Sequence, residues 1–216
     1  MSANKKPQEK SRLHPRNKNR ERYDLDALIH STPELKNFVK PNKFGDESVD
    51  FSNPAAVKML NKALLHHYYG IKYWTFSDEN LCPPIPGRAD YMHYMADLLC
   101  ESNFGRIPNG NNITCLDIGV GANVIYPILA SQIYDWNMVG CDIHRDAIKI
   151  AMKNIRLTKG LSNLIDIRYQ DDPANIFKGI LKPCSSLLLG TPIKKAPHAR
   201  GALFIWLVLR PVLRSF

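Results

Sequence analysis

Apolar residues in the second half of the chain form short runs that alternate with longer amphipathic stretches. The short runs have the length and composition of buried strands and cover residues 113–118, 138–142 and 164–169. The stretches that follow each of them predict helices over residues 123–133, 145–159 and 174–181. Strands that alternate with helices in this way are typical of parallel βαβ units. The pattern therefore predicts an α/β fold with a doubly wound parallel sheet.

A different pattern, with apolar residues at helical spacing, precedes these units. Ser52 or Asn53 can cap a helix that opens at Pro54, and Val57, Leu60 and Leu64 would lie on one face of it. Further helices are predicted to start at 23, 32 and 88, and the proline-rich residues 71–87 predict an irregular loop. We therefore expect a helical N-terminal extension over residues 23–110 and a Rossmann-like core over residues 111–182.

The charge of the chain is concentrated at its N-terminus. The formal net charge is +9, and the first 22 residues carry eight Lys or Arg side chains against only Glu9 and Glu21. A segment of this composition, poor in large apolar residues, predicts a disordered basic arm over residues 1–22. It could be a solvating tail or an arm that contacts RNA, in which case the binding residues would be Lys5, Lys6, Arg12, Arg16, Lys18, Arg20 and Arg22.

Composition argues against several other classes of protein. The five cysteines, at positions 82, 100, 115, 141 and 184, form no C-x-x-C pair, and His66-His67 lack a metal-binding context, so we predict neither disulfides nor a metal site. No uncharged apolar run is long enough to cross a bilayer, and the basic N-terminus has no apolar core of a secretory signal behind it. We expect a soluble protein of the cytoplasm without a membrane partner.

The segment LDIGVGAN, residues 116–123, carries the clearest chemical signal. Gly119 and Gly121 allow a sharp turn between a strand and a helix N-terminus, where free amide groups favour a polar ligand. Val124 stands where a dinucleotide-binding turn would have its third glycine. Asp117 before the turn and Asp142 at the end of the next strand complete a pattern that looks like the S-adenosylmethionine site of Rossmann-like methyltransferases. Both acids could instead be loop or strand-end caps.

Four longer segments carry a more specific resemblance. In order, they are HPRNKNRERYDLDAL, SVDFSNPAAVKMLNKALL, LCPPIPGRADYMHYMADLL and LDIGVGANVIYPILA. They resemble the bacterial ribosomal large-subunit RNA methyltransferase F family and its eukaryotic adenine-methylating relatives, over roughly residues 11–182. The resemblance implies a class I S-adenosylmethionine-dependent methyltransferase. Its methyl acceptor would be the exocyclic amine of one adenine in 23S ribosomal RNA or in a large-subunit precursor.

The resemblance also implies roles for individual residues. Arg88 would contact the carboxylate of S-adenosylmethionine, Gly119 would line the pocket for its methionine part, and Asp142 would hold the ribose. Gln170 and Asp171, at the end of the third strand, would lie near the adenine ring. The cofactor-binding candidates are therefore Arg88, Asp117, Gly119, Gly121, Asn123, Asp142, Gln170 and Asp171.

One expected motif is missing, and no catalytic residue is assigned for that reason. The family places an Asn-Pro-Pro-aromatic loop after the fourth strand, where it orients the target amine, and this sequence has none. From Pro173 to Phe216 the chain also contains no Asp or Glu among 44 residues. We expect an incomplete parallel sheet, a change of reading frame near Lys182, an atypical tail over residues 183–216 and little or no activity. The rival functions are a non-catalytic RNA-binding protein and a small-molecule methyltransferase.

Overall fold

The computed structural model describes residues 12–110, 113–172, 174–180 and 207–209, and the chain divides into two compact units. The first unit holds the chain up to Trp74 together with Leu81–Leu98. The second holds Thr75–Asn80 and everything from Leu99 onward. The boundary thus falls inside helix α3 (Ile85–Glu101), whereas the sequence pattern predicted it at residue 110.

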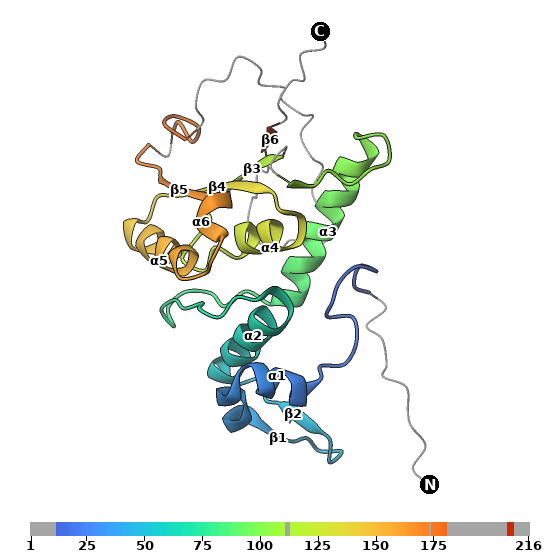
Figure 1. Cartoon of the computed structure of the whole chain (residues 1–216). Helices are drawn as coiled ribbons and strands as arrows, with labels where there is room; N and C mark the ends of the chain where they lie inside the picture. The colour runs from blue at the N-terminus through green and yellow to red at the C-terminus, as the bar shows by residue number, and fades with distance from the viewer. Residues whose placement is uncertain (1–11, 111–112, 173, 181–206, 210–216) are drawn as a thin grey trace. The chain divides into compact units, whose positions relative to one another are not determined.

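Helices make up most of the first unit, as predicted (Figure 1). They are α1 (Leu25–Ser31), the 3-10 helix η1 (Pro33–Phe38), α2 (Pro54–Tyr69) and most of α3. Asn53, one of the two predicted caps, accepts hydrogen bonds from the amides of Ala55 and Ala56 at the start of α2. Gly70 ends the same helix in the left-handed conformation, which suits a residue without Cβ. The fully buried side chains of this unit include Leu28, Leu35, Leu64 and Met92.

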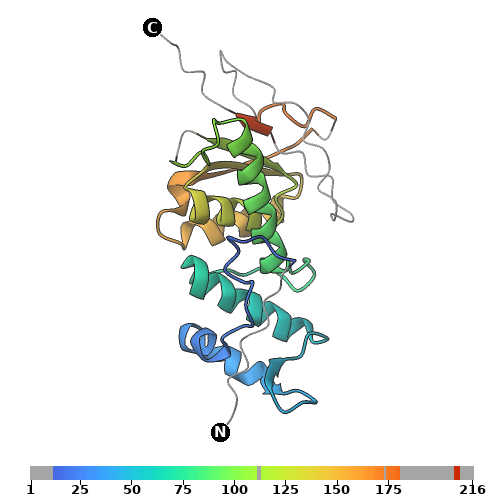
Figure 2. The same cartoon turned by 90° about the vertical axis from the view of Figure 1, so that its right-hand side faces the viewer.

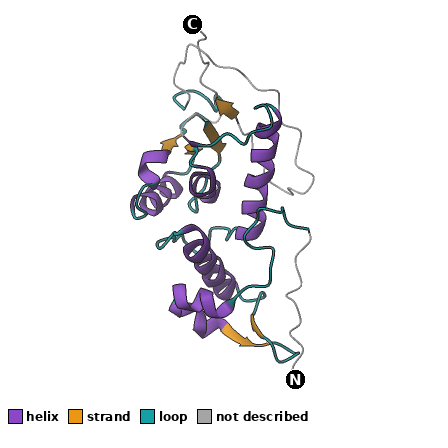
Figure 3. Cartoon of the chain, turned by 45° about the vertical axis from the view of Figure 1, so that its right-hand side comes forward, coloured by secondary structure: helices purple, strands orange, loops and turns teal. Residues whose placement is uncertain are grey.

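The extension is not entirely helical. Strands β1 (Val39–Pro41) and β2 (Glu47–Val49) form an antiparallel hairpin that the apolar pattern did not predict (Figure 3). Its turn is held by the Asn42 side chain, whose Oδ1 accepts hydrogen bonds from the amides of Phe44 and Asp46. The strands have three residues each, which is too short to show an alternating pattern.

The second unit is built on a mixed sheet whose parallel part was predicted. Strands β3 (Thr114–Ile118), β4 (Asn137–Asp142) and β5 (Ile165–Tyr169) are parallel, in the order β5-β4-β3. A short strand from the tail, β6 (Leu207–Leu209), pairs with β3 in the antiparallel sense. Helices α4 (Ile125–Tyr134), α5 (Arg145–Arg156) and α6 (Leu161–Leu164) lie on one side of the three parallel strands (Figures 1 and 2).

The structure corrects two of the predicted helices of this unit. Helix α4 begins at Ile125 and not at 123, because Val124 takes a left-handed conformation with φ 48°. Residues 174–180 form turns in place of a helix, and Ile180 packs on Leu116, Val139 and Cys141 of the sheet. The tail beyond, in which we expect a changed reading frame, lies outside the described residues except for Leu207–Leu209.

Candidate functional site

The predicted glycine turn follows β3 directly and leads into α4. Gly119 and Gly121 have φ values of 77° and 64°, in the region that side chains with a Cβ avoid. The amides of Gly119 and Val120 donate to the carbonyl oxygen of Cys141 at 2.8 and 3.0 Å, so the turn is fastened to the end of β4. A Cβ built on either glycine would meet no atom within 4 Å. No described atom therefore fills the space beside the Cα atoms of these two glycines.

Asp142, at the end of β4, is held against this turn. One carboxylate oxygen accepts the Gly121 amide at 2.9 Å, and the other accepts the His144 amide at 2.9 Å. The side chain is buried, and the carbonyl oxygen of Asp142 accepts the amide of Gln170, the residue after β5. The structure thus brings Asp142 and the glycine turn together, as the sequence pattern predicted. The bonds to Gly121 and His144 show that its carboxylate also fixes the backbone on both sides.

Asp117 is more deeply buried than Asp142, with 2% of its surface exposed. Its Oδ1 atom has no hydrogen-bond partner among the residues that the structure describes. Burial, and next the charge of Asp142, raise the pKa of Asp117 to about 7. Near neutral pH the site therefore holds a carboxyl group whose proton is readily gained or lost and one of whose oxygens has no internal partner.

The remaining candidates of the second unit have structural partners of their own. Asn123 Oδ1 accepts the Ile125 amide at 3.2 Å, at the start of α4. Gln170 is buried, and its side chain donates to the carbonyl oxygens of Asn175, Ile176 and Lys178 while it accepts the Asp172 amide. Gln170 therefore shapes the 172–178 turn, whereas Asp171 is exposed beside it.

Arg88 lies in the first turn of α3, in the other compact unit. It is half-buried, and its amide donates to the Pro84 carbonyl at 3.2 Å. The contact between Arg88 and the cofactor stays a prediction.

The sequence pattern missed a group of side chains beside Asp142. Tyr169 is the β5 residue paired with Asp142, and the Arg145 guanidinium lies 4.0 Å from the centre of its ring. Ile143, the next residue after Asp142, is half exposed. An aromatic, a cation and an aliphatic residue thus neighbour Asp142 along the chain or across the β4–β5 pairing. Only Ile143 could have been found from the sequence, as an apolar residue directly after a strand-end acid.

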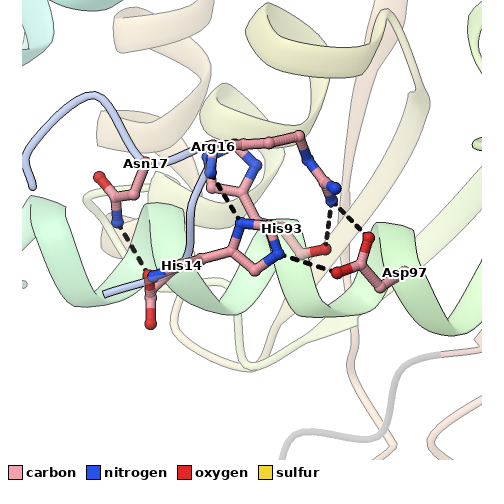
Figure 4. A network of polar contacts seen from close by, with 6 residues as sticks. His14, Arg16, Asn17, His93 and Asp97 are labelled. Atoms are coloured by element: carbon pink, nitrogen blue, oxygen red, sulfur yellow. Dashed lines mark hydrogen bonds and ion pairs between the residues drawn. The ribbon is translucent and has the colours of Figure 1, made fainter. Parts of the chain in front are cut away.

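The prediction of a disordered arm is wrong for residues 12–22. Here the chain packs along α3 (Figure 4). The side chains of His14, Asn17 and Asn19 are buried. His14 donates from Nε2 to Asp97 at 2.8 Å, and Arg16 donates to Asp97 at 2.7 Å and to the His93 carbonyl at 2.9 Å. The composition signalled disorder because it counts these polar residues as solvated, whereas α3 offers them specific partners.

The ring of His93 is part of the same arrangement. It stacks on the His14 ring with centroids 5.1 Å apart. Burial, and next the charges of His14 and Arg16, lower the pKa of His93 to about 4, so the ring is neutral at physiological pH. Hydrogen bonds and charge from His14 and Arg16 outweigh burial and lower the pKa of Asp97. The arm is therefore attached to α3 by an ionised Asp97 and by a His93 whose ring is neutral.

The seven predicted RNA-binding cations fall into two groups. Lys5 and Lys6 lie outside the described residues. Within the described part, Arg16 binds Asp97, Lys18 donates to the Tyr68 carbonyl at 3.0 Å, and Arg22 lies 3.5 Å from Asp46. Arg12 is exposed and Arg20 is partly buried. Some cations of the arm thus attach it to the rest of the first unit, and others are exposed to solvent.

We expect Asp97→Asn to detach the arm from α3 in part. The change removes the charge from the hydrogen bonds to His14 and Arg16, and because Asp97 is 43% exposed the expected loss of stability is about 1 kcal/mol. Urea unfolding and amide hydrogen exchange at residues 14–19 would measure it. Asp146→Asn, which alters an exposed pair with Lys149, is the matched control. Equal effects of the two substitutions would contradict this role for Asp97.

We expect Gly121→Ala to destabilise the glycine turn itself. With φ at 64° an alanine would be strained by about 1 kcal/mol, although its Cβ would meet no neighbour. Thermal unfolding would report the strain. Gly87→Ala, at an α3 position whose Cβ also meets no atom and whose φ is not positive, is the control. A Gly121→Ala protein as stable as Gly87→Ala would show that the turn has another conformation in solution.

The described residues contain neither a metal-ligating cluster nor a helix able to span a membrane. No group of three or more His, Cys, Asp or Glu side chains there is placed to hold a metal ion. Across the same residues, no helix combines the length and apolar character needed to span a bilayer. Cys82, Cys100, Cys115 and Cys141 are free thiols, and burial raises the pKa of Cys115 to about 12.

Comparison with known proteins identifies similar sequences and structures. The RNA methyltransferase family Methyltransf_10 matches residues 7–186. The chain is 54% identical over 175 residues to the ribosomal RNA large subunit methyltransferase F of Yersinia enterocolitica, and 53% identical to that of Serratia proteamaculans. Each match covers 81% of this chain and 52% of the relative, so the chain spans about half the length of the curated relatives.

Two solved structures of the human METTL16 methyltransferase resemble the fold described above. The N-terminal domain in complex with SAH (S-adenosylhomocysteine) is 27% identical, with a TM-score of 0.69, over 82% of this chain and 66% of that one. The catalytic domain in complex with the MAT2A 3'UTR hairpin 6 is 28% identical, with a TM-score of 0.63, over 74% of this chain and 54% of that one.

Proposed function

Because the chain belongs to the Methyltransf_10 family of RNA methyltransferases, we propose that its second unit binds S-adenosylmethionine at the carboxyl ends of β3, β4 and β5. The whole protein would transfer the methyl group to the exocyclic amine of one adenine in 23S ribosomal RNA. The adenine and the 23S target follow from the family resemblance, and the names of the curated relatives support a ribosomal RNA substrate.

The residues present fit this cofactor. The deciding observation is the open turn at Gly119 and Gly121 beside Asp117, whose Oδ1 is buried without a partner among the described residues. S-adenosylmethionine carries an amino group that can donate hydrogen bonds to a carboxylate. It also carries two ribose hydroxyls and no pyrophosphate. The absence of a third glycine at Val124 is compatible with such a ligand. A dinucleotide would need a glycine there, so that the helix packs closely on the strand and the backbone approaches the pyrophosphate. The complex of METTL16 with SAH supports the same ligand class.

Each side chain would have a defined task. The bound cofactor supplies an activated methyl group on a sulfonium. In this chain, Asp117 and the turn would hold the methionine part, and Asp142 would hold the ribose while it keeps the Gly121 amide in place. Ile143 and Tyr169 would exclude water on the nucleoside side. These contacts orient the donor, and orientation contributes much of the rate in such transfers.

Turnover needs a second set of residues that this sequence does not contain. The family uses an Asn-Pro-Pro-aromatic loop to hold the target amine, and no such segment occurs in the sequence. We therefore expect this polypeptide to bind the cofactor without methylating RNA at a significant rate. Methylation by the purified chain of ribosomal RNA that lacks the modification would refute this expectation.

Titration calorimetry of the purified chain tests cofactor binding. We expect saturable heat with S-adenosylmethionine and with S-adenosylhomocysteine, accompanied by a rise in the melting temperature that follows ligand concentration. NAD⁺ is the comparison ligand, for which we expect no heat. Binding of NAD⁺ without binding of either methyl compound would overturn the proposal.

We propose that RNA binds through the arm. The exposed Lys and Arg side chains of the arm would contact the RNA phosphates. The hairpin complex of METTL16 supports an RNA partner for the fold. Filter binding of a ribosomal RNA fragment at several salt concentrations would measure the number of phosphate contacts. A chain that binds RNA with a steep salt dependence but shows no cofactor-dependent rise in melting temperature would be a non-catalytic RNA-binding protein.

A further inference from the structure

Asn154 is a buried polar side chain that no part of the proposed mechanism uses. It lies on α5 next to the apolar stripe of Ile148, Ala151 and Ile155, and its exposure is 0%. A carboxamide in such a position loses its water and must find partners inside the protein. Asn154 finds three of them, all on the backbone.

Two of these partners belong to the same residue. The amide of Thr75 donates to Asn154 Oδ1 at 2.9 Å, and Asn154 Nδ2 donates to the Thr75 carbonyl at 2.8 Å. This paired arrangement resembles one step of a β-ladder, with a side chain in the place of the second strand. It fastens the beginning of the Thr75–Asn80 segment to α5 within the second unit.

The third partner is part of the glycine turn. The second N–H of Asn154 Nδ2 donates to the Ala122 carbonyl at 3.2 Å. Ala122 lies between Gly121 and the left-handed Val124, so its peptide group belongs to the part of the turn with the least regular conformation. One carboxamide thus holds the turn on one side and the Thr75–Asn80 segment on the other.

We propose that Asn154 is a positioning residue that couples occupancy of the cofactor site to the order of the Thr75–Asn80 segment. The inference rests on the proposed function, since it takes the glycine turn to be the cofactor site. A ligand that orders the turn fixes the Ala122 carbonyl. That carbonyl fixes the Asn154 carboxamide, and the carboxamide in turn fixes both backbone groups of Thr75. Loss of the carboxamide separates the segment from the site and loosens the turn.

Asn154→Asp tests the coupling with little change in shape. The substitution replaces both Nδ2 donors by an oxygen that faces the carbonyls of Thr75 and Ala122. We expect S-adenosylhomocysteine to bind more weakly, by up to about 30-fold, the limit reached when ligand binding must supply the ordering free energy of two net hydrogen bonds. We also expect hydrogen exchange at Gly121, Ala122 and Thr75 to be about tenfold faster in the free protein. In the wild type, ligand binding should slow exchange at Thr75; in the variant it should not.

Two controls separate positioning from general stability. Asn163→Asp makes the same change in charge on an exposed side chain of α6 and should leave the binding unchanged. Leu161→Ala removes a fully buried side chain of α6 and should lower the melting temperature while the affinity for S-adenosylhomocysteine stays within about threefold. Asn154→Ala, which buries no charge, takes the same measurements if Asn154→Asp does not fold.

The outcomes distinguish the inference from the proposed function. If the Asn154 variants lose stability like Leu161→Ala but keep their affinity and the wild-type exchange at the turn, Asn154 is a core residue and the inference is wrong. If the wild type binds no S-adenosylhomocysteine, the proposed function fails. The exchange of the turn and Thr75 amides in the free variants then still decides whether Asn154 holds the two segments together.

Discussion

Asp142→Ala is expected to abolish measurable cofactor binding. The change removes the acceptor of two backbone amides, those of Gly121 and His144, together with the carboxylate proposed to hold the ribose. Loss of the ribose contacts and of the turn geometry should weaken S-adenosylhomocysteine by at least about 100-fold, which corresponds to ~3 kcal/mol. The unpaired Gly121 amide should also lower the stability of the unit by about 1–2 kcal/mol. Titration calorimetry and urea unfolding would measure the two effects separately.

The matched control for this prediction is Asp146→Ala. Asp146 lies four residues further along the chain, carries the same charge and is 89% exposed, with Lys149 as its partner. Its loss should change neither affinity nor stability beyond the small contribution of an exposed pair. If Asp142→Ala binds S-adenosylhomocysteine as the Asp146→Ala control does, Asp142 does not belong to the cofactor site.

The strand-end acids and the glycine turn could be predicted from the sequence because their signals are local. Asp117 and Asp142 follow apolar runs directly, and parallel strands bring their carboxyl ends to one edge of a sheet. Val124 could not be predicted, because a left-handed valine contradicts its own conformational preference and depends on the surrounding turn. Because of this conformation, α4 begins at Ile125, two residues later than predicted.

Features that depend on contacts between residues far apart in the sequence were missed, because a local sequence pattern carries no information about distant partners. The attachment of His14 and Arg16 to α3 joins residues about 80 positions apart, so composition alone predicted a free arm. Asn154 did leave a trace in the sequence, as a polar residue inside the buried face of an amphipathic helix. That trace indicates a satisfied polar group but does not identify Thr75 and Ala122 as its partners.

Asp117→Asn is expected to stabilise the protein at neutral pH but not at low pH. The folded protein has a pKa of about 7 at this carboxyl group, raised from a reference value of 3.8 by burial and by Asp142. Well below pH 3.8 the group is protonated in both the folded and the unfolded state, so it contributes no pH-dependent difference. As the pH rises toward 7 the unfolded chain ionises while the folded site retains its proton, which destabilises the wild type progressively. The asparagine variant does not ionise and avoids this loss.

The expected gain is about 2–4 kcal/mol above pH 7, smaller near pH 5, and falls to about 0.5 kcal/mol or less at pH 4 and below. The nearby thiols of Cys115 and Cys141 stay neutral in this range, because burial raises their pKa values to about 12 and about 11, so Asp142 is the charge that matters. Urea unfolding of both proteins at several pH values between 4 and 8 would measure the difference. A stability difference that is constant over this range would mean that Asp117 is not a buried titrating acid. A separate measurement tests contact with the ligand. If saturation with S-adenosylmethionine stabilises the wild type but not Asp117→Asn, the Oδ1 atom of Asp117 contacts the ligand.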